Sequence, residues 1–263
     1  MAWPTGCEIA MVDQAFTQSV ASSCRVWIDP LARREVHYDV LLDNLAKSSQ
    51  PSEWFDPGLP MLESLPVKEG GRAAAWFIRL GDTDAVLRQY RRGGMAAHFF
   101  RDQYVWQGAQ SARSFAEFSL LQAMLKMGLP VPRPLAAMVQ RKGLIYRAAL
   151  ITQRIPAAHP LLSFTDPEVW SNAGQVIARM HDAGVWHADL NVFNILVDAT
   201  RKVWLIDFDR SRRIKMNSGL RTENISRLLR SVRKVAAPLE ATCWSALTAG
   251  YQQSWQSLNP ESK

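Results

Sequence analysis

The spacing of three polar side chains in the second half of the chain constrains its fold more than any other feature. Four residues separate Asp189 from Asn194, and Asp207 follows thirteen positions after Asn194. Two short apolar runs, at 195–197 and 203–206, lie between the last two residues and predict two strands joined by a turn. Such a hairpin brings Asn194 and Asp207 to one edge, because one precedes its first strand and the other follows its second. Amide and carboxylate oxygens are ligands that suit Mg²⁺.

The full run from His187 to Asp207 resembles the catalytic loop and metal loop of the protein-kinase-like fold. A His-x-Asp pair alone is more often a helix cap or a turn, so the resemblance rests on the complete spacing. It implies that Asp189 orients an alcohol and accepts its proton. It also implies that Asn194 and Asp207 hold a Mg²⁺ ion that bridges nucleotide phosphates. His187 is expected to pack the loop without a direct part in the chemistry.

The order of the predicted elements agrees with that fold. Strands are expected at 74–78, 85–88 and 144–152, with one helix at 114–127. The second half opens with a helix whose N-cap is Asp166. The hairpin and then a basic helical region follow it.

These elements predict an α+β, bilobal, protein-kinase-like fold. A β-rich N-lobe would carry one helix, and an α-rich C-lobe would carry the catalytic hairpin. The predicted domains are an N-terminal extension at 1–66, the N-lobe at 67–155 and the C-lobe at 156–263. The expected active site is a cleft between the two lobes.

The predicted N-lobe offers residues for ATP in the order that the fold requires. Arg88 stands where protein kinases carry a strand lysine, and Glu117 is either its ion-pair partner or a solvent-exposed helix glutamate. A glycine pair ahead of the first strand is either a loop that covers the phosphates or an ordinary turn. The three residues at 153–155 would form a hinge whose backbone N–H and C=O groups bind adenine. The predicted ATP-binding set is Gly70, Gly71, Arg88, Glu117, Gln153 and Ile155.

The net charge is concentrated in one part of the chain. Lys and Arg number 31 against 24 Asp and Glu, a net charge of +7, and the window 201–234 alone holds eleven basic residues against three acidic ones. Such a patch predicts an anionic partner (nucleic acid, a phosphorylated ligand or anionic lipid), or else a solvated surface that keeps the protein soluble. Apolar residues recur at helical spacing from Ile225 to Val232 with basic residues between them, which predicts a basic amphipathic helix. Few aromatic residues interleave with the basic ones, which argues against nucleic acid because bases stack on aromatic rings.

Further observations favour a reducing, cytoplasmic setting. The first twenty residues hold Glu8 and Asp13 and no Lys or Arg, a pattern that does not predict a signal peptide. No apolar run approaches the ~18–20 residues of a membrane span. The three cysteines, Cys7, Cys24 and Cys243, are scattered, which argues against a disulfide framework and a common zinc site.

Four phrases point to one family within this fold. They are residues 90–94 (Tyr-Arg-Arg-Gly-Gly), 128–134 (Gly-Leu-Pro-Val-Pro-Arg-Pro), 187–191 (His-Ala-Asp-Leu-Asn) and 207–210 (Asp-Phe-Asp-Arg). Together with the helix at 224–234, they make the chain similar to the 3-deoxy-D-manno-octulosonic acid (Kdo) kinases of the lipopolysaccharide kinase group. The similarity covers about residues 60–240.

The resemblance implies an enzyme that transfers the γ-phosphate of ATP, with Mg²⁺, to the 4-hydroxyl of Kdo on a lipid A precursor. It implies a peripheral protein at the cytoplasmic face of the inner membrane of Gram-negative bacteria, where a basic patch gains about 1 kcal/mol per Lys or Arg near an anionic leaflet. No nucleic-acid partner is expected. Arg210, Arg212 and Arg213 are expected to face the acceptor, with structural salt bridges as the alternative. The acceptor- or membrane-binding set is completed by Arg227, Arg230 and Lys234.

Departures from the protein-kinase motifs narrow the range of substrates that we expect. Arg88 replaces the strand lysine, Ala188 replaces the arginine that binds a phosphorylated activation loop, and Asp209 replaces the glycine of the metal loop. No Ala-Pro-Glu follows, so a small or lipid-linked acceptor is favoured over a protein. The alternatives are a heptose or other sugar kinase of the same fold and a nucleotide-binding pseudokinase. A basic nucleic-acid-binding protein is a third alternative, which would leave the three polar side chains without a role.

Overall fold

The computed structural model describes residues 8–11, 24–28, 51–67, 75–90, 104–108 and 111–260. The chain forms two compact units. Unit 1 contains Met1–Ser119 and Arg133–Arg154, and unit 2 contains Leu120–Pro132 and Ile155–Lys263. Among the described residues, unit 1 is built mainly from strands and unit 2 mainly from helices, which confirms the α+β fold class. The domain boundaries at residues 66 and 155 stay predictions.

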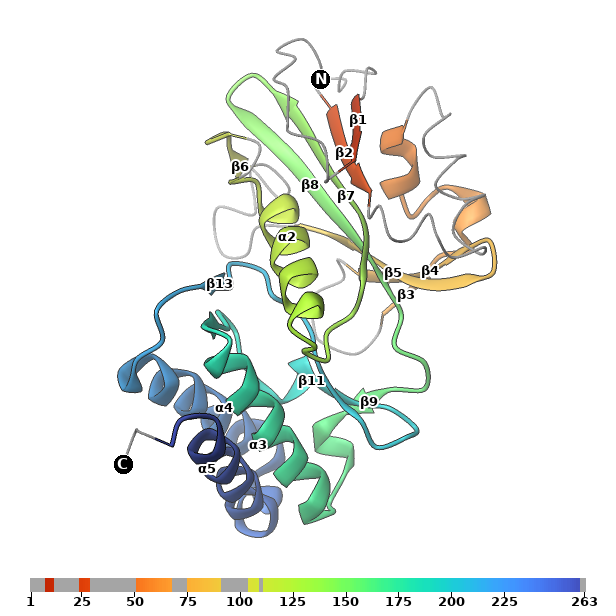
Figure 1. Cartoon of the computed structure of the whole chain (residues 1–263). Helices are drawn as coiled ribbons and strands as arrows, with labels where there is room; N and C mark the ends of the chain where they lie inside the picture. The colour runs from red at the N-terminus through yellow and green to blue at the C-terminus, as the bar shows by residue number, and fades with distance from the viewer. Residues whose placement is uncertain are drawn as a thin grey trace. The chain divides into compact units, whose positions relative to one another are not determined.

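Unit 1 is organised around a mostly antiparallel sheet (Figure 1). In the described ranges the sheet has eight strands, in the order β1-β2-β7-β8-β5-β4-β3, with β6 paired to β8. β1 and β2 pair in parallel, and the other neighbours are antiparallel. The strands are β1 (Glu8–Met11), β2 (Cys24–Ile28), β3 (Leu65–Pro66), β4 (Ala75–Leu80), β5 (Thr83–Gln89), β6 (Tyr104–Val105), β7 (Pro134–Lys142) and β8 (Ile145–Gln153).

Three of these eight strands were predicted from the sequence, and the other five, β7 among them, were not. β4, β5 and β8 confirm the strands expected at 74–78, 85–88 and 144–152. β7 was not predicted. Its first seven residues are all buried, so it lacks the alternation of apolar and polar residues that identifies a half-exposed strand.

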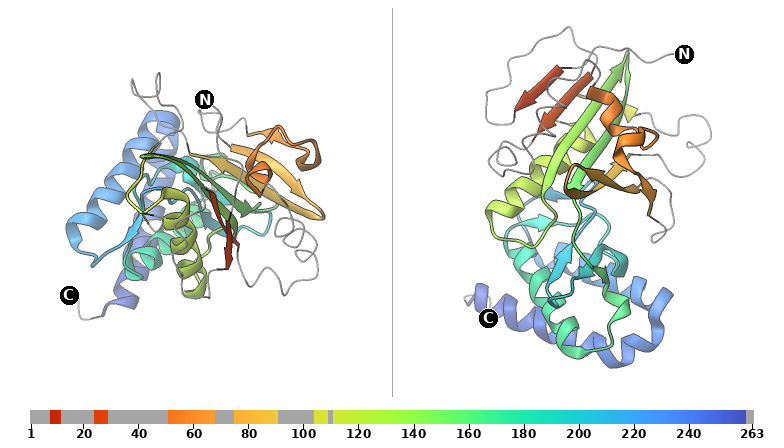
Figure 2. Two further views of the ribbon diagram at one scale, coloured as in Figure 1. Left: turned by 90° about the horizontal axis from the view of Figure 1, so that it is seen from above. Right: turned by 90° about the vertical axis from the view of Figure 1, so that its right-hand side faces the viewer.

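Two sets of side chains cover opposite faces of the sheet in unit 1. Successive strand residues point to opposite faces, and in β2 Val26 packs in a core cluster with Phe55 and Leu62. Those two residues come from short 3₁₀ helices, η2 (Pro51–Phe55) and η3 (Pro60–Leu62). Trp27 instead stacks on Phe115 of helix α2 (Arg113–Lys126), with ring centroids 4.0 Å apart. Figure 2 shows α2 and the 51–62 segment on different sides of the strands.

Helix α3 (Pro167–Asp182) is central to unit 2 and begins as predicted. Asp166 is the N-cap, and its carboxylate accepts a hydrogen bond from the Glu168 N–H at 2.9 Å. The helix packs tightly on α5 (Ser245–Leu258), because a Cβ added to Gly174 would lie 2.0 Å from the backbone oxygen of Leu247. Glycine therefore permits the close approach of the two helices.

The remaining elements of unit 2 position its loops. β11 (Ile195–Val197) and β12 (Val203–Leu205) form the predicted hairpin, with β9 (His159–Pro160) beside β11. β10 (Val185–Trp186) pairs with β13 (Arg212–Arg213). The predicted basic helix lies within α4 (Ser218–Leu239), which a π-helical turn (Glu240–Trp244) joins to α5. Two 3₁₀ turns complete the unit, η5 (Leu161–Ser163) and η6 (Val192–Asn194). Among the described helices, none combines the length and the apolar composition that a membrane crossing requires.

Candidate active site

The loop between β10 and β11 presents the carboxylate of Asp189 to solvent. The Asp189 side chain is 59% exposed, whereas the next residue, Leu190, is fully buried. The backbone oxygen of Asp189 accepts hydrogen bonds from Asn194 Nδ2 at 2.9 Å and from Asn191 Nδ2 at 3.0 Å. Two side-chain amides thus fix the Asp189 carbonyl, while its carboxylate stays accessible to an outside hydroxyl.

His187 holds this loop to the hairpin. The Asp189 N–H donates to His187 Nδ1 at 3.1 Å, so the ring proton is on Nε2, which donates to the carbonyl oxygen of Ile206 at 3.1 Å. The ring lies 4.6 Å from the ring of Phe208. Burial lowers the pKa of His187 and keeps the ring neutral. These contacts agree with the packing role expected for His187.

Asn224 is a site residue that the sequence analysis missed. It is fully buried on α4, and its Oδ1 accepts a hydrogen bond from the His187 N–H at 3.1 Å. Its Nδ2 donates to the His187 carbonyl at 2.9 Å. The same Oδ1 lies 3.2 Å from Nε2 of His181, whose pKa is lowered to about 4 by burial. The available signal was an asparagine four positions before Leu228 on the apolar stripe, since a buried amide requires partners.

Asn194 and Asp207 lie at the same end of the hairpin, as the spacing predicts. The Ile206 N–H donates to the Asn194 carbonyl at 3.0 Å, which sets the next residue, Asp207, beside Asn194. The Asn194 side chain is buried, and its Nδ2 donates to the Asp189 carbonyl. Among the described residues, none donates a hydrogen bond to its Oδ1. Asp207 has φ 61°, a left-handed conformation that aspartate tolerates better than most residues.

This donor set fits a magnesium ion shared with phosphates. Asn194 Oδ1 and the Asp207 carboxylate are hard oxygen ligands, and Mg²⁺ usually takes one or two protein oxygens together with substrate phosphates. Within the described part of the chain there is no cluster of three or more His, Cys, Asp or Glu that could hold a metal ion alone. The pair therefore suits an ion that arrives with a nucleotide.

Arg227 lies in this site, although the sequence analysis placed it with the acceptor- or membrane-binding residues. Its Nη1 donates to Asp189 Oδ1 at 3.1 Å, and its side chain is 40% exposed. The other oxygen of the carboxylate, Oδ2, accepts from Asn191 Nδ2 at 3.3 Å. The candidate base is therefore paired with a guanidinium from α4.

The other predicted basic residues lie on exposed positions of unit 2. Arg212 and Arg213 form β13, and the Arg212 guanidinium lies 5.4 Å from the centroid of the Trp186 ring. Arg210 is also exposed and has φ 61°. On α4, Arg230 and Lys234 are exposed, while Leu228 and Val232 on the inner face are buried. Their roles stay predictions.

In unit 1, Arg88 and Glu117 form the ion pair that was one of the two alternatives for Glu117. Arg88 Nη2 contacts Glu117 Oε2, and the Glu117 side chain is 3% exposed. Tyr90 adds its hydroxyl, which donates to the same oxygen at 2.5 Å and accepts from Arg88 Nη2 at 3.2 Å. The pair is therefore held within unit 1, and its role in ATP binding stays a prediction.

The predicted hinge lies where the chain passes from unit 1 to unit 2, after Arg154. The Gln153 N–H already donates to the Arg133 carbonyl at 2.8 Å, and the Arg154 N–H donates to Asp84 at 3.0 Å. The Ile155 N–H has no hydrogen-bond partner among the described residues. Gly70 and Gly71 lie outside the described residues.

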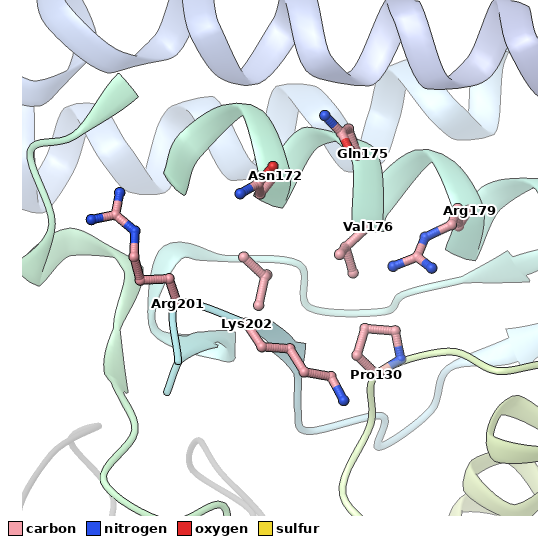
Figure 3. Close-up of a pocket in the computed structure, with 8 residues that line it drawn as sticks. Pro130, Asn172, Gln175, Val176, Arg179, Arg201 and Lys202 are labelled. Atoms are coloured by element: carbon pink, nitrogen blue, oxygen red, sulfur yellow. The ribbon is translucent and has the colours of Figure 1, made fainter. Parts of the chain in front are cut away.

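A separate pocket of about 210 Å³ lies in unit 2, beside α3 and the β11–β12 turn (Figure 3). None of the predicted site residues lines it. Arg201 in its wall binds the N-cap Asp166, and this hydrogen bond lowers the pKa of that carboxyl. Lys202 has its Nζ 4.0 Å from the centroid of the Trp204 ring. These two cations are engaged in local packing, and the pocket offers no carboxylate for proton transfer.

Comparison with known proteins shows which proteins this chain is similar to. The model of the lipopolysaccharide kinase (Kdo/WaaP) family matches residues 61–251. A 3-deoxy-D-manno-octulosonic acid kinase of Xanthomonas campestris pv. campestris (strain B100) is 48% identical over 189 residues, which are 70% of this chain and 74% of that protein. A protein of the same description from Stenotrophomonas maltophilia (strain R551-3) is 44% identical over 200 residues, 74% of this chain and 80% of that protein. The range matched by the family model includes the catalytic loop and the β11–β12 hairpin.

Proposed function

Because this chain belongs to the lipopolysaccharide kinase (Kdo/WaaP) family, we propose that it transfers the γ-phosphate of ATP to the 4-hydroxyl of Kdo on a lipid A precursor. Family membership confirms the predicted protein-kinase-like fold and an ATP-dependent phosphotransferase of lipopolysaccharide synthesis. The observation that carries the proposal is the exposed carboxylate of Asp189, on a backbone fixed by Asn191 and Asn194.

The chemistry proposed for unit 2 is a single displacement at phosphorus. The acceptor hydroxyl donates a hydrogen bond to Asp189, and its oxygen attacks the γ-phosphorus. The bond from that phosphorus to the β–γ bridging oxygen breaks, ADP leaves, and the proton passes to the Asp189 carboxylate. His187 stays neutral and holds the loop, because burial lowers its pKa.

The cofactors proposed are ATP and Mg²⁺. Asn194 and Asp207 would hold the ion, which when bound neutralises phosphate charge as it moves to the leaving group. In unit 1, Arg88 would bind a nucleotide phosphate while Glu117 and Tyr90 fix its guanidinium. At the hinge, the unpartnered Ile155 N–H is the proposed donor to adenine.

A mass-spectrometric phosphotransfer assay tests the proposal. It uses ATP, Mg²⁺ and a Kdo–lipid A precursor, with a heptose-bearing core acceptor in parallel. We expect one phosphate on the Kdo acceptor alone, and about a 10²- to 10⁴-fold lower rate for Asp189→Ala with ATP affinity nearly unchanged. Transfer to the heptose acceptor alone would keep the mechanism and change the substrate. ATP binding without transfer to either acceptor would favour the pseudokinase alternative.

We also propose that the protein acts as a peripheral protein at the cytoplasmic face of the inner membrane, without a nucleic-acid partner. The support is the exposure of Arg230 and Lys234 on the outer side of α4, each of which gains about 1 kcal/mol near an anionic leaflet. The test is cosedimentation with vesicles containing anionic lipid. Arg230→Gln/Lys234→Gln should lower binding more than it lowers turnover on a soluble acceptor. Arg179→Gln/Lys202→Gln, which removes the same charge beside α3, is the matched control, and equal losses in the two variants would contradict a specific membrane face.

A further inference from the structure

Arg227 is a basic residue of α4 that contacts the catalytic loop. Its Nη1 donates to Oδ1 of Asp189 at 3.1 Å. Arg233, six positions later on the same helix, binds Glu240 through Nε at 2.9 Å from both carboxylate oxygens, and it is 58% exposed. Two arginines of one helix thus each bind one carboxylate, and the carboxylate at Arg227 is the proposed base.

Other side chains of α4 already fix the backbone of the loop without Arg227. Asn224, three positions before it, binds the N–H and the carbonyl of His187. Ser231, four positions after it, accepts a hydrogen bond from the Val192 N–H at 3.0 Å. These neutral contacts hold the loop on either side of Asp189. Arg227 therefore adds a positive charge to the site, and the loop backbone is held without it.

The guanidinium of Arg227 is only partly used by Asp189. Its Nε is buried and has no hydrogen-bond partner among the described residues. The side chain as a whole is 40% exposed, so N–H groups beyond the one that binds Asp189 reach solvent next to the carboxylate. A guanidinium binds carboxylates and phosphates through two parallel hydrogen bonds, which a single contact to Asp189 leaves open.

We propose that Arg227 is a specificity-determining residue that binds an anionic group of the acceptor next to the hydroxyl that is phosphorylated. The inference rests on the proposed function. Without acceptor, Arg227 pairs with Asp189. With acceptor, the hydroxyl hydrogen-bonds to Asp189 while the anionic group takes the open N–H groups of Arg227. A neutral sugar leaves those groups without an anionic partner, so the site favours a sugar acid.

The contact distances limit where the anionic group lies. A hydroxyl oxygen about 2.7 Å from Asp189 Oδ1 lies at most about 6 Å from Arg227 Nη1, given the 3.1 Å contact. An anion oxygen that accepts a hydrogen bond of about 2.9 Å from Nη1 is then at most about 9 Å from the reacting oxygen. The carboxylate of the accepting sugar acid is the nearer source, and a phosphate of the lipid portion is the other.

The test compares three acceptors with four proteins. The acceptors are a Kdo–lipid A precursor, its carboxyl-reduced derivative and its dephosphorylated derivative. The proteins are the wild type, Arg227→Gln, Arg227→Lys and the control Arg233→Gln, which also removes one arginine–carboxylate pair from α4. Thermal melting establishes that each variant is folded. We measure kcat and KM for the acceptor, and KM for ATP, in every combination.

We expect Arg227→Gln to lower kcat/KM for the intact acceptor by roughly 10- to 100-fold, the effect of one charged hydrogen bond. The KM for ATP stays the same, and Arg227→Lys recovers part of the loss. With the derivative that lacks the recognised anion, the wild type and Arg227→Gln have equal kcat/KM for the acceptor. Equality with the carboxyl-reduced acceptor assigns the carboxylate, and equality with the dephosphorylated acceptor assigns a phosphate.

Two results overturn the inference. One is an equal loss in Arg227→Gln on all three acceptors, which would make Arg227 a positioning residue for Asp189 only. The other is an Arg233→Gln variant that loses as much as Arg227→Gln, which would make the effect one of general charge. Failure of the proposed function is distinct, because then the wild type itself transfers no phosphate to the intact acceptor.

Discussion

Replacing Asn224 with alanine tests the anchoring of the catalytic loop directly. The variant loses the two hydrogen bonds to His187 and the one to His181, all of them buried. A buried polar group left without a partner costs about 1–3 kcal/mol, so we expect the free energy of unfolding of unit 2 to fall by about 3–5 kcal/mol. For a chain of this size, that corresponds to a decrease in melting temperature on the order of 10 °C.

Differential scanning calorimetry, paired with kcat on the proposed acceptor, measures both consequences. Ser231→Ala is the control, because it removes a single hydrogen bond to the same loop, that from the Val192 N–H, and should cost about 1 kcal/mol. In Asn224→Ala we expect kcat to fall by a larger factor than the affinity for ATP, since the loop carries Asp189. A melting temperature within about 2 °C of the wild type would refute the anchoring role.

Three further predictions concern other parts of the molecule. Glu117→Gln should raise the KM for ATP and leave the KM for the acceptor unchanged, because Glu117 fixes the guanidinium of Arg88; steady-state kinetics with each substrate varied in turn checks this. The pKa of His181 is about 4 in the folded protein against 6.5 as its ordinary value, so the folded state binds fewer protons between these values. The contribution of His181 to stability is complete above about pH 6.5 and is lost as the pH falls toward 4, with about 2 kcal/mol lost by pH 5. Urea unfolding midpoints measured at about pH 6.5 and about pH 5 show the loss, which should be smaller in His181→Gln. Gly174→Ala should destabilise the protein by about 3 kcal/mol, because the new Cβ would lie 2.0 Å from a backbone oxygen of α5. Gly219→Ala, where the nearest atom would be 3.4 Å away, is the control in the same urea titrations.

The sequence predicted those parts of the fold whose causes are local. The α3 N-terminus follows from Asp166 and its proline neighbour, and the hairpin follows from two short apolar runs beside polar residues. β7 escaped prediction because its burial is set by what packs on both faces of the sheet, which a single strand's sequence does not encode. β2 escaped for a similar reason, since its neighbour in the sheet, β7, lies more than one hundred residues away.

The residues of the candidate site also fall into two groups, those placed by local geometry and those placed by tertiary packing. The residues that motif spacing identified, Asp189, Asn194 and Asp207, lie within one loop and one hairpin, so their proximity follows from local geometry. Asn224 and Arg227 reach the loop from a helix that begins far later in the sequence. Their contribution depends on which face of that helix packs inward, a property of tertiary packing.

The positions of the basic residues around the axis of α4 distinguish residues that the sequence analysis grouped by charge alone. At about 100° per residue, Arg227 lies about 60° from Asn224 around the helix, whereas Arg230 lies about 120° away. Arg227 is therefore at the border of the buried stripe and reaches Asp189, while Arg230 faces outward. Arg233 is engaged by Glu240, and Arg221 lies 3.8 Å over the Trp255 ring. The proposed acceptor role therefore rests on Arg227, which reaches the catalytic loop from the border of the apolar stripe. The proposed membrane role rests on the outward positions, and this division gives the vesicle and acceptor experiments separate sets of residues to change.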